Sequence, residues 1–301
     1  MSGAEFVPFT LVPLLIGCLA AVACALPGNF LVLRRQALIG DAISHVVLPG
    51  IVVAFLVTGT ITSWPMLIGS AMAAIVAVAL IEVIRRFGRI EPGAAMGGTV
   101  TAMVAAGVLL LEPSDTSGVH LDVAHALVGH LESLIWLDAT GWASLADPAA
   151  LAGLPPELFR IGAVTIAMVL GLVLFWRPLA ISTFDESFAG TLGLPIRTIG
   201  LGLVISAAIA AVAAFDAVGS IIVIAMFLCP PAAARLMTNR LAAQVLWSVA
   251  FALASAIIGF VLAGYGPLWI GGENAVSAAG MIGTISGLIL ALAALFGPAR
   301  N

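Results

Sequence analysis

A chain of 301 residues with 62% apolar and only 9% charged residues cannot be a water-soluble domain, because soluble domains average about 25% charged residues. The mean hydropathy of +1.22 makes the lipid bilayer the solvent for most of the chain. The formal net charge of −4 excludes little, but all eleven basic residues are arginine, and a chain without lysine has no Walker A loop for ATP phosphates. If ATP drives this protein, another chain must bind it.

Candidate membrane spans follow one another along the chain, each close to the roughly 20 residues that cross a bilayer as a helix. The stretch 217–236 is the least regular, because Pro230 and Pro231 interrupt it, and this favours a broken helix or a re-entrant hairpin. We therefore expect an all-α, polytopic membrane protein with about 8–10 transmembrane helices. The nine predicted spans are 9–27, 37–58, 64–84, 94–111, 159–177, 196–215, 217–236, 241–263 and 275–296.

The arginines orient these spans. With the N-terminus outside, ten of the eleven lie on the cytoplasmic side and only Arg160 lies outside, as the positive-inside rule requires. Arg34, at the cytoplasmic end of the first span, is expected to extend toward the interface. The N-terminus has no positively charged region before its first apolar run, so we expect no cleavable signal peptide.

The longest polar interruption, residues 112–157, is expected to form an external segment of one domain that covers residues 1–301. Within it, 119–137 could form a short helix at the surface or against the bundle; if it crossed the membrane, the side of the N-terminus would change. Metal-binding residue types are dense here, but the histidines are five residues apart and do not share a helix face. A weak metal-collecting surface and a solvated polar segment both stay open, and the spacing favours the second. The residues concerned are His120, Asp122, His125, His130 and Glu132.

Asp41 and His45 are polar residues just inside the second span. At a spacing of four they lie on one face of a helix, and burying an ionised Asp at mid-membrane costs about 3 kcal/mol, so such residues usually face a cavity and a partner. Carboxylate and imidazole suit Zn(II) or Mn(II). Two ligands are too few for zinc, and a two-fold related copy of the chain would supply two more.

Alternatively, Asp41 caps a helix that starts at Ala42, with His45 bound to a backbone carbonyl. The neighbouring Pro49-Gly50 pair suggests a bend in the helix, which favours a position of Asp41 at a cavity over a role as helix cap.

The cytoplasmic stretch FDESFAGTLGLP, residues 184–195, is a second candidate site. A short amphipathic helix here would offer Phe184, Phe188 and Leu192, four residues apart, to a groove on another protein. The alternative is an ordinary capped loop. Asp216 is expected to mark the outer turn between two spans, with a role in a transport pathway as the alternative. The three cysteines form no CxxC pair, which makes a disulfide framework or a thiolate metal site improbable.

Three stretches in this order, NFLVLRRQALIGDAISHVVLPGI (29–51), TFDESFAGTLGLP (183–195) and VGSIIVIAMFLCPPAAARLMTNR (218–240), resemble the permease subunits of zinc, manganese and iron ABC importers. The resemblance covers about residues 10–296 and implies that Asp41 and His45 belong to the metal pathway. It also implies a cytoplasmic coupling loop, about 179–195, that docks on an ATPase through Phe184, Asp185, Glu186, Phe188, Ala189 and Gly193. Weaker candidates for the metal pathway are His120, His125, His130 and Asp216.

The function implied is that of a permease in the bacterial inner membrane that works as a dimer with cytoplasmic ABC ATPase subunits and an extracytoplasmic metal-binding protein. The chain itself would be no enzyme, would hold no permanent cofactor, and would contact membrane lipid but no nucleic acid. The transported ion would be Zn(II), then Mn(II), then iron, because imidazole ligands and the His-rich outer segment favour zinc. The alternative is a secondary transporter or channel driven by an ion gradient. An intramembrane hydrolase is disfavoured by the lack of HExxH and GxSxG motifs.

Overall fold

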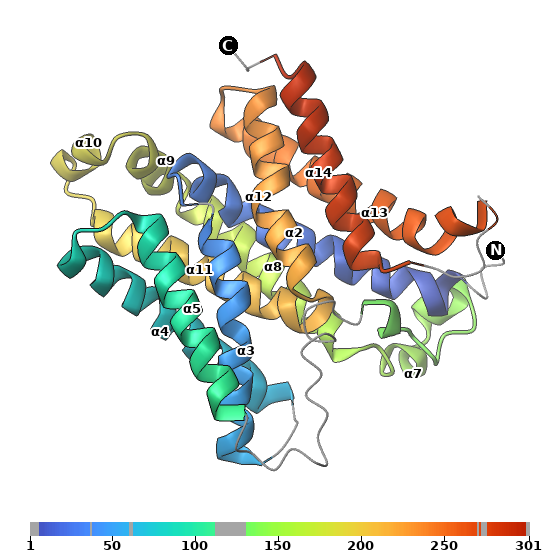
Figure 1. Ribbon diagram of the computed structural model, residues 1–301. Helices are drawn as coiled ribbons and strands as arrows, with labels where there is room; N and C mark the ends of the chain where they lie inside the picture. The colour runs from blue at the N-terminus through green and yellow to red at the C-terminus, as the bar shows by residue number, and fades with distance from the viewer. Residues whose placement is uncertain are drawn as a thin grey trace.

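The computed structural model describes residues 6–36, 38–59, 63–111, 131–269, 271 and 276–298, and all regular structure in these residues is helical (Figure 1). A π-helix, η1 (Val7–Leu11), continues directly into the first long helix. The long helices are α2 (Val12–Leu33), α3 (Leu38–Thr58), α4 (Ser63–Gly88), α5 (Pro92–Leu111), α8 (Pro156–Leu174), α11 (Ile196–Val218), α12 (Ser220–Met237), α13 (Leu241–Trp269) and α14 (Ala278–Phe296). The short ones are η2 (Leu131–Ser133), η3 (Trp142–Ala146), α7 (Pro148–Leu151), α9 (Trp176–Phe184) and α10 (Glu186–Thr191).

The membrane spans agree with the sequence prediction. Within the described residues, eight helices are long and apolar enough to cross a bilayer, the first of them running from Val7 to Leu33. The second predicted span corresponds to α3, whose apolar part is His45–Thr58. The predicted all-α, polytopic fold with about 8–10 transmembrane helices is therefore confirmed.

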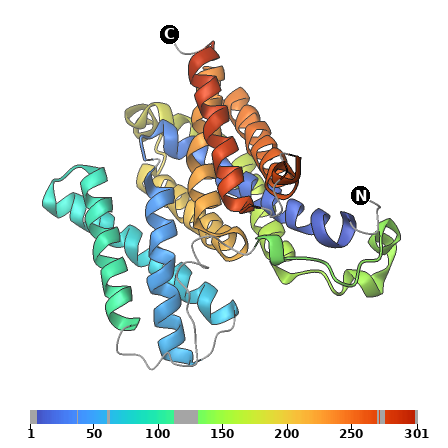
Figure 2. The same cartoon turned by 45° about the vertical axis from the view of Figure 1, so that its right-hand side comes forward.

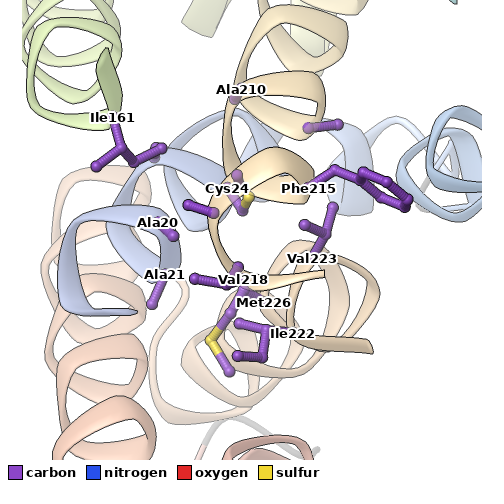
Figure 3. Packing of buried hydrophobic residues seen from close by; sticks show 14 of the residues in the cluster. Ala20, Ala21, Cys24, Ile161, Ala210, Phe215, Val218, Ile222, Val223 and Met226 are labelled. Atoms are coloured by element: carbon purple, nitrogen blue, oxygen red, sulfur yellow. The ribbon is translucent and has the colours of Figure 1, made fainter. Parts of the chain in front are cut away.

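The bundle is organised around α2. This helix packs against α8, α11, α12 and α13, while α3, α4 and α5 form a group of their own that Figure 2 separates from α13 and α14. Small residues let the neighbouring backbones approach α2 closely, as is usual between helices in membranes. Figure 3 shows the resulting core, in which Ala20, Ala21 and Cys24 of α2 meet side chains of α8, α11 and α12. Those side chains include Ile161, Ala210, Phe215, Val218, Ile222, Val223 and Met226.

The expected break in the seventh span is wrong. Pro230 and Pro231 both lie inside the continuous helix α12 and are buried. A proline at position 231 cannot donate to the carbonyl of Phe227, one turn earlier. That carbonyl lies against Gly28 of α2, where a Cβ atom would be only 2.5 Å from its oxygen. The helix continues through the prolines because protein, rather than lipid, covers the Phe227 carbonyl that Pro231 leaves without a hydrogen bond.

A buried polar network joins α2 to α13. The Asn29 amide donates to the carbonyl of Ala25 at 2.7 Å and to the hydroxyl of Ser248 at 3.0 Å. The Gln244 amide lies 3.4 Å from the Asn29 carbonyl oxygen, and all three of these side chains are fully buried. Such hydrogen bonds between membrane helices contribute about 0.6 kcal/mol each on average, so their main effect is to fix how the two helices face each other.

The described part of the external segment, in light green in Figure 2, packs beside the N-terminal end of α2. Trp136 is buried, its backbone N–H donates to Pro8 and its indole N–H to Ala150, both at 2.8 Å. The carboxylate of Glu132 accepts the N–H of Ala278 at the start of α14. Of the predicted helix 119–137, only 131–137 is described, and it is a single helical turn followed by irregular chain, held against the bundle.

Candidate metal pathway and coupling element

The helix that carries Asp41 and His45 begins before both of them. Because α3 starts at Leu38, Asp41 lies inside the helix and is not its N-cap, so the alternative reading of this residue is wrong. The predicted helical spacing is confirmed, since residues 38–58 form one continuous helix and positions four apart share a face. His45 is half-buried.

Close contacts fix α3 against three neighbours. Gly40, directly before Asp41, packs against α12, where a Cβ atom on the glycine would lie 2.7 Å from the ring of Phe227. A Cβ atom on Gly50 would be 2.5 Å from the carbonyl of Gly69 on α4, and Pro49 lies against Gly107 of α5. The Pro49-Gly50 pair therefore serves close packing between helices, and the helix that carries Asp41 and His45 is tightly packed on its neighbours.

A cavity of about 1040 Å³ opens beside the predicted cytoplasmic part of α3. Its walls come from α3, α4, α10 and α11 and include Ile39 and Ala42, which flank Asp41 in sequence. Charged residues line it: Glu82 and Arg85, which form an ion pair of 2.8 Å, and also Arg34, Glu186 and Arg197. The space next to α3 is thus wide enough for water, and charged side chains form part of its otherwise mostly apolar wall.

The stretch 184–195 is both a capped turn and a short helix. The Asp185 carboxylate accepts the backbone N–H of Phe188 at 2.8 Å and so begins α10. Gly193, with φ at +74°, ends the helix in the left-handed conformation that glycine adopts without strain. Ala189 is fully buried, whereas Phe184, Phe188 and Leu192 are 59%, 52% and 53% exposed. Capping and packing residues therefore hold an apolar surface outward, with Glu186 in the first turn of the helix.

Arg34 connects this element to the central helix, a contact that the sequence analysis missed. Its guanidinium donates to the hydroxyls of Ser182, at 2.8 Å, and Thr183, at 3.1 Å, in the last turn of α9. The side chain is half-buried, and its guanidinium is bound by α9. Burial lowers the pKa of Arg34, and the nearby carboxylate of Glu186 raises it. In the sequence, this contact is indicated only by an arginine at the end of the first span and by a Ser-Thr pair, Ser182 and Thr183, directly before the FDES stretch.

Of the weaker candidates for the metal pathway, only Asp216 lies on a helix that the structure describes. His120, His125 and His130 lie outside the described residues. Asp216 is in the last turn of α11, three residues before Gly219, which joins α11 to α12, so its predicted place at a turn is confirmed. No group of three or more His, Cys, Asp and Glu residues that could hold a metal occurs among the described residues. The three cysteines are free thiols.

The fold and the site together define a transport permease. It is an all-helical membrane subunit with polar residues inside one span, α3, and with a short helix, α10, that exposes apolar side chains. The chain belongs to the ABC 3 transport family, whose model matches residues 7–138 and 154–296. This membership makes it a multi-pass protein of the bacterial inner membrane.

Relatives and a solved structure agree with this assignment. The chain is 35% identical to the manganese transport system membrane protein MntD of Bacillus subtilis over 285 residues, 95% of this chain and 91% of the relative. It is 37% identical to the zinc transport system membrane protein TroD of Treponema pallidum over 289 residues, 96% of this chain and 74% of the relative. The structure of PsaBC from Streptococcus pneumoniae in complex with Fab matches with a TM-score of 0.74 at 25% identity, covering 96% of this chain and 92% of that one. The resemblance to metal ABC permeases seen in the sequence is confirmed.

Proposed function

We propose that this chain is the permease subunit of an ATP-driven importer of a divalent metal ion, with Asp41 and His45 as ligands on the transport pathway. The observation that carries the proposal is the continuous helix α3, which keeps a carboxylate and an imidazole four residues apart on one face. Membership of an ABC family supports ATP-driven transport over the alternative of an ion gradient.

A second copy of the chain completes this proposal. One Asp and one His are too few to hold Zn(II), and a two-fold axis beside α3 would bring two of each to a shared site. The metal is the substrate here and stays only briefly. Relatives are named for both manganese and zinc transport. We propose Zn(II) first because imidazole is a better ligand for zinc than for manganese, and Mn(II) second.

ATP hydrolysis belongs to a separate ATPase in this proposal, since a chain without lysine has no Walker A loop. Its docking site is the apolar surface of Phe184, Phe188 and Leu192 at the end of α9 and on α10. Arg34 links that surface to α2 and gives movements of the ATPase a direct connection to the centre of the bundle. On the other side of the membrane, a metal-binding protein would deliver the ion.

Uptake of radioactive zinc and manganese by cells that produce the complete importer tests the pathway. We expect Asp41→Asn and His45→Ala each to lower uptake at least about a hundredfold, because loss of one ligand typically costs several kcal/mol of metal affinity. The matched control is Thr58→Ala at the other end of α3, whose hydroxyl bonds to the carbonyl of Ala54 within its own helix.

The amount of permease in the membrane and its co-purification with the ATPase are measured for every variant. Uptake near the wild-type level in both Asp41→Asn and His45→Ala would overturn the pathway assignment. Competition between the two metals in reconstituted vesicles decides the substrate, and stronger inhibition of zinc uptake by manganese than the reverse would make manganese the substrate.

A further inference from the structure

A second cavity, of about 440 Å³, opens between α2, α8, α9 and α11. Its walls are almost entirely apolar and include Phe30 of α2, Leu172 of α8 and Leu203 of α11. We call this cavity the α8–α11 groove. It contains neither Asp41 nor His45 nor the exposed aromatic residues of the coupling element, so the proposed function does not use it.

Glycines on facing helices create the groove. Gly171 of α8 and Gly202 of α11 both line it, and a Cβ atom added to either would meet nothing within 4 Å. A membrane helix with an inward glycine usually draws its neighbour close, as Gly50 and Gly69 do in α3 and α4. Here the glycines face open space, and the gap between α8 and α11 stays unfilled by protein.

The groove is about as long as the hydrocarbon part of one lipid leaflet is thick, and it lies at the height of the cytoplasmic leaflet. Its α11 wall extends from Thr198 to Ser206, about 12 Å at 1.5 Å per residue, and the hydrocarbon of one leaflet is about 15 Å thick. The walls from α2 and α8 are the last two turns of those spans, so all three lie at the end that the arginines predict to be cytoplasmic.

The outer surface of α8 faces lipid. Ile166, Leu170 and Val173 are 62%, 56% and 67% exposed, and apolar side chains this open need hydrocarbon around them. In the bundle, α8 packs on α2 and α11, whereas α3 packs on α4, α5, α11 and α12. A second copy that approaches α3 therefore leaves α8 and the groove open to the bilayer.

One arginine lies where the groove reaches the cytoplasmic surface. Arg177 directly precedes Pro178 of the groove wall. Its side chain is exposed, and it has no acidic partner among the ion pairs of the described residues. Arg197, by contrast, lines the cavity beside α3. Guanidinium groups at this level bind phosphate and attract the anionic lipids of the inner leaflet.

We propose that the α8–α11 groove binds one acyl chain of an anionic phospholipid, whose phosphate lies at Arg177. The apolar walls recognise the chain and the arginine recognises the headgroup. Filling the groove from either glycine would expel the lipid without touching the metal pathway or the coupling surface.

Native mass spectrometry of the purified, delipidated permease tests this proposal. Palmitoyl-oleoyl phosphatidylglycerol is compared with palmitoyl-oleoyl phosphatidylcholine, which has the same acyl chains and no net charge. We expect one phosphatidylglycerol to be retained, with an affinity about fivefold above phosphatidylcholine for one arginine contact. Arg177→Gln should abolish this preference, while weak binding of both lipids persists.

Gly202→Leu should remove retention of both lipids, and Gly171→Leu should do the same from the opposite wall. The matched control is Gly162→Leu on α8, where a Cβ atom also meets nothing within 4 Å but which is not among the residues that line the groove. Thermal unfolding in detergent confirms that each variant is folded. Equal retention in Gly202→Leu and Gly162→Leu would overturn the proposal. So would a shift of Gly202→Leu from dimer to monomer with lipid retention unchanged, which would make the groove an interface between copies.

Discussion

At the scale of single residues, Arg34 is the side chain whose role depends most on contacts far away in sequence. Its two hydrogen bonds reach Ser182 and Thr183, almost 150 positions further along the chain. Arginine can hold two hydroxyls at once because its guanidinium is a planar fork with several donors, whereas lysine is a single, strongly hydrated point charge. The charge alone is therefore not enough for this contact.

Arg34→Lys and Arg34→Gln should weaken coupling without removing the metal pathway. Losing hydrogen bonds from a charged donor costs about 1.5–3 kcal/mol, so we expect the stimulation of ATP hydrolysis by metal in the reconstituted importer to fall about tenfold or more. Arg35→Gln is the matched control, because Arg35 is the neighbouring arginine and is exposed. If Arg34→Lys kept full stimulation, the fork geometry would have no part in coupling. Equal losses in Arg34→Gln and Arg35→Gln would point to a general effect of charge.

At the scale of helices, close packing through glycine fixes α3. A Cβ atom on Gly50 would come within 2.5 Å of the carbonyl oxygen of Gly69, which is backbone and cannot turn away. Gly50→Ala should therefore push α3 and α4 apart and cost about 1–3 kcal/mol of stability. The expected result is a clear drop in the thermal unfolding midpoint of the permease in detergent.

Gly97→Ala on α5 is the control for that experiment, because a Cβ atom there meets nothing within 4 Å. Replacing glycine by alanine in an open helix position raises stability by up to about 1 kcal/mol through helix propensity alone. The two substitutions should therefore move the midpoint in opposite directions. A rise with Gly50→Ala would show that α3 and α4 can separate at no cost.

The helices also show which features a sequence can predict. A helix must be long and apolar to cross the bilayer, so hydropathy alone predicted where the spans lie. The spacing of four residues predicted that Asp41 and His45 share one face of a helix. Local chemistry predicted that 184–195 would be capped or helical, and Asp185 and Gly193 make it both. The errors concern contacts between distant segments: Gly28 covers the carbonyl freed by Pro231, and Ser182 and Thr183 hold Arg34. The sequence around these residues does not indicate which distant segment they contact, because that depends on how the helices pack in the folded bundle.

At the scale of the whole molecule, the two ligands proposed for the metal, Asp41 and His45, are too few to complete a zinc site within one chain. The helix α3 packs on α4, α5, α11 and α12, and its glycines leave no room between it and α4 or α12. The residues that the structure describes contain no group of three or more His, Cys, Asp and Glu that could hold a metal. If a metal passes here, ligand number makes the assembly with a second copy the functional unit.

Mixed dimers distinguish a shared site from two independent ones. A wild-type copy and an Asp41→Asn copy with different affinity tags are produced together, and the mixed importer is isolated by two successive purifications and reconstituted. A shared site loses one of its ligands in every mixed importer, so we expect zinc uptake far below half of the wild-type rate and close to that of the double mutant. Two independent sites would leave about half of the wild-type uptake, because the wild-type copy keeps its full ligand set.

A mixed dimer of wild-type and Thr58→Ala copies shows that the tags and purification preserve uptake. Half-maximal uptake in the Asp41→Asn mixture would mean that each chain carries its own pathway, and the missing ligands would then have to come from its own residues.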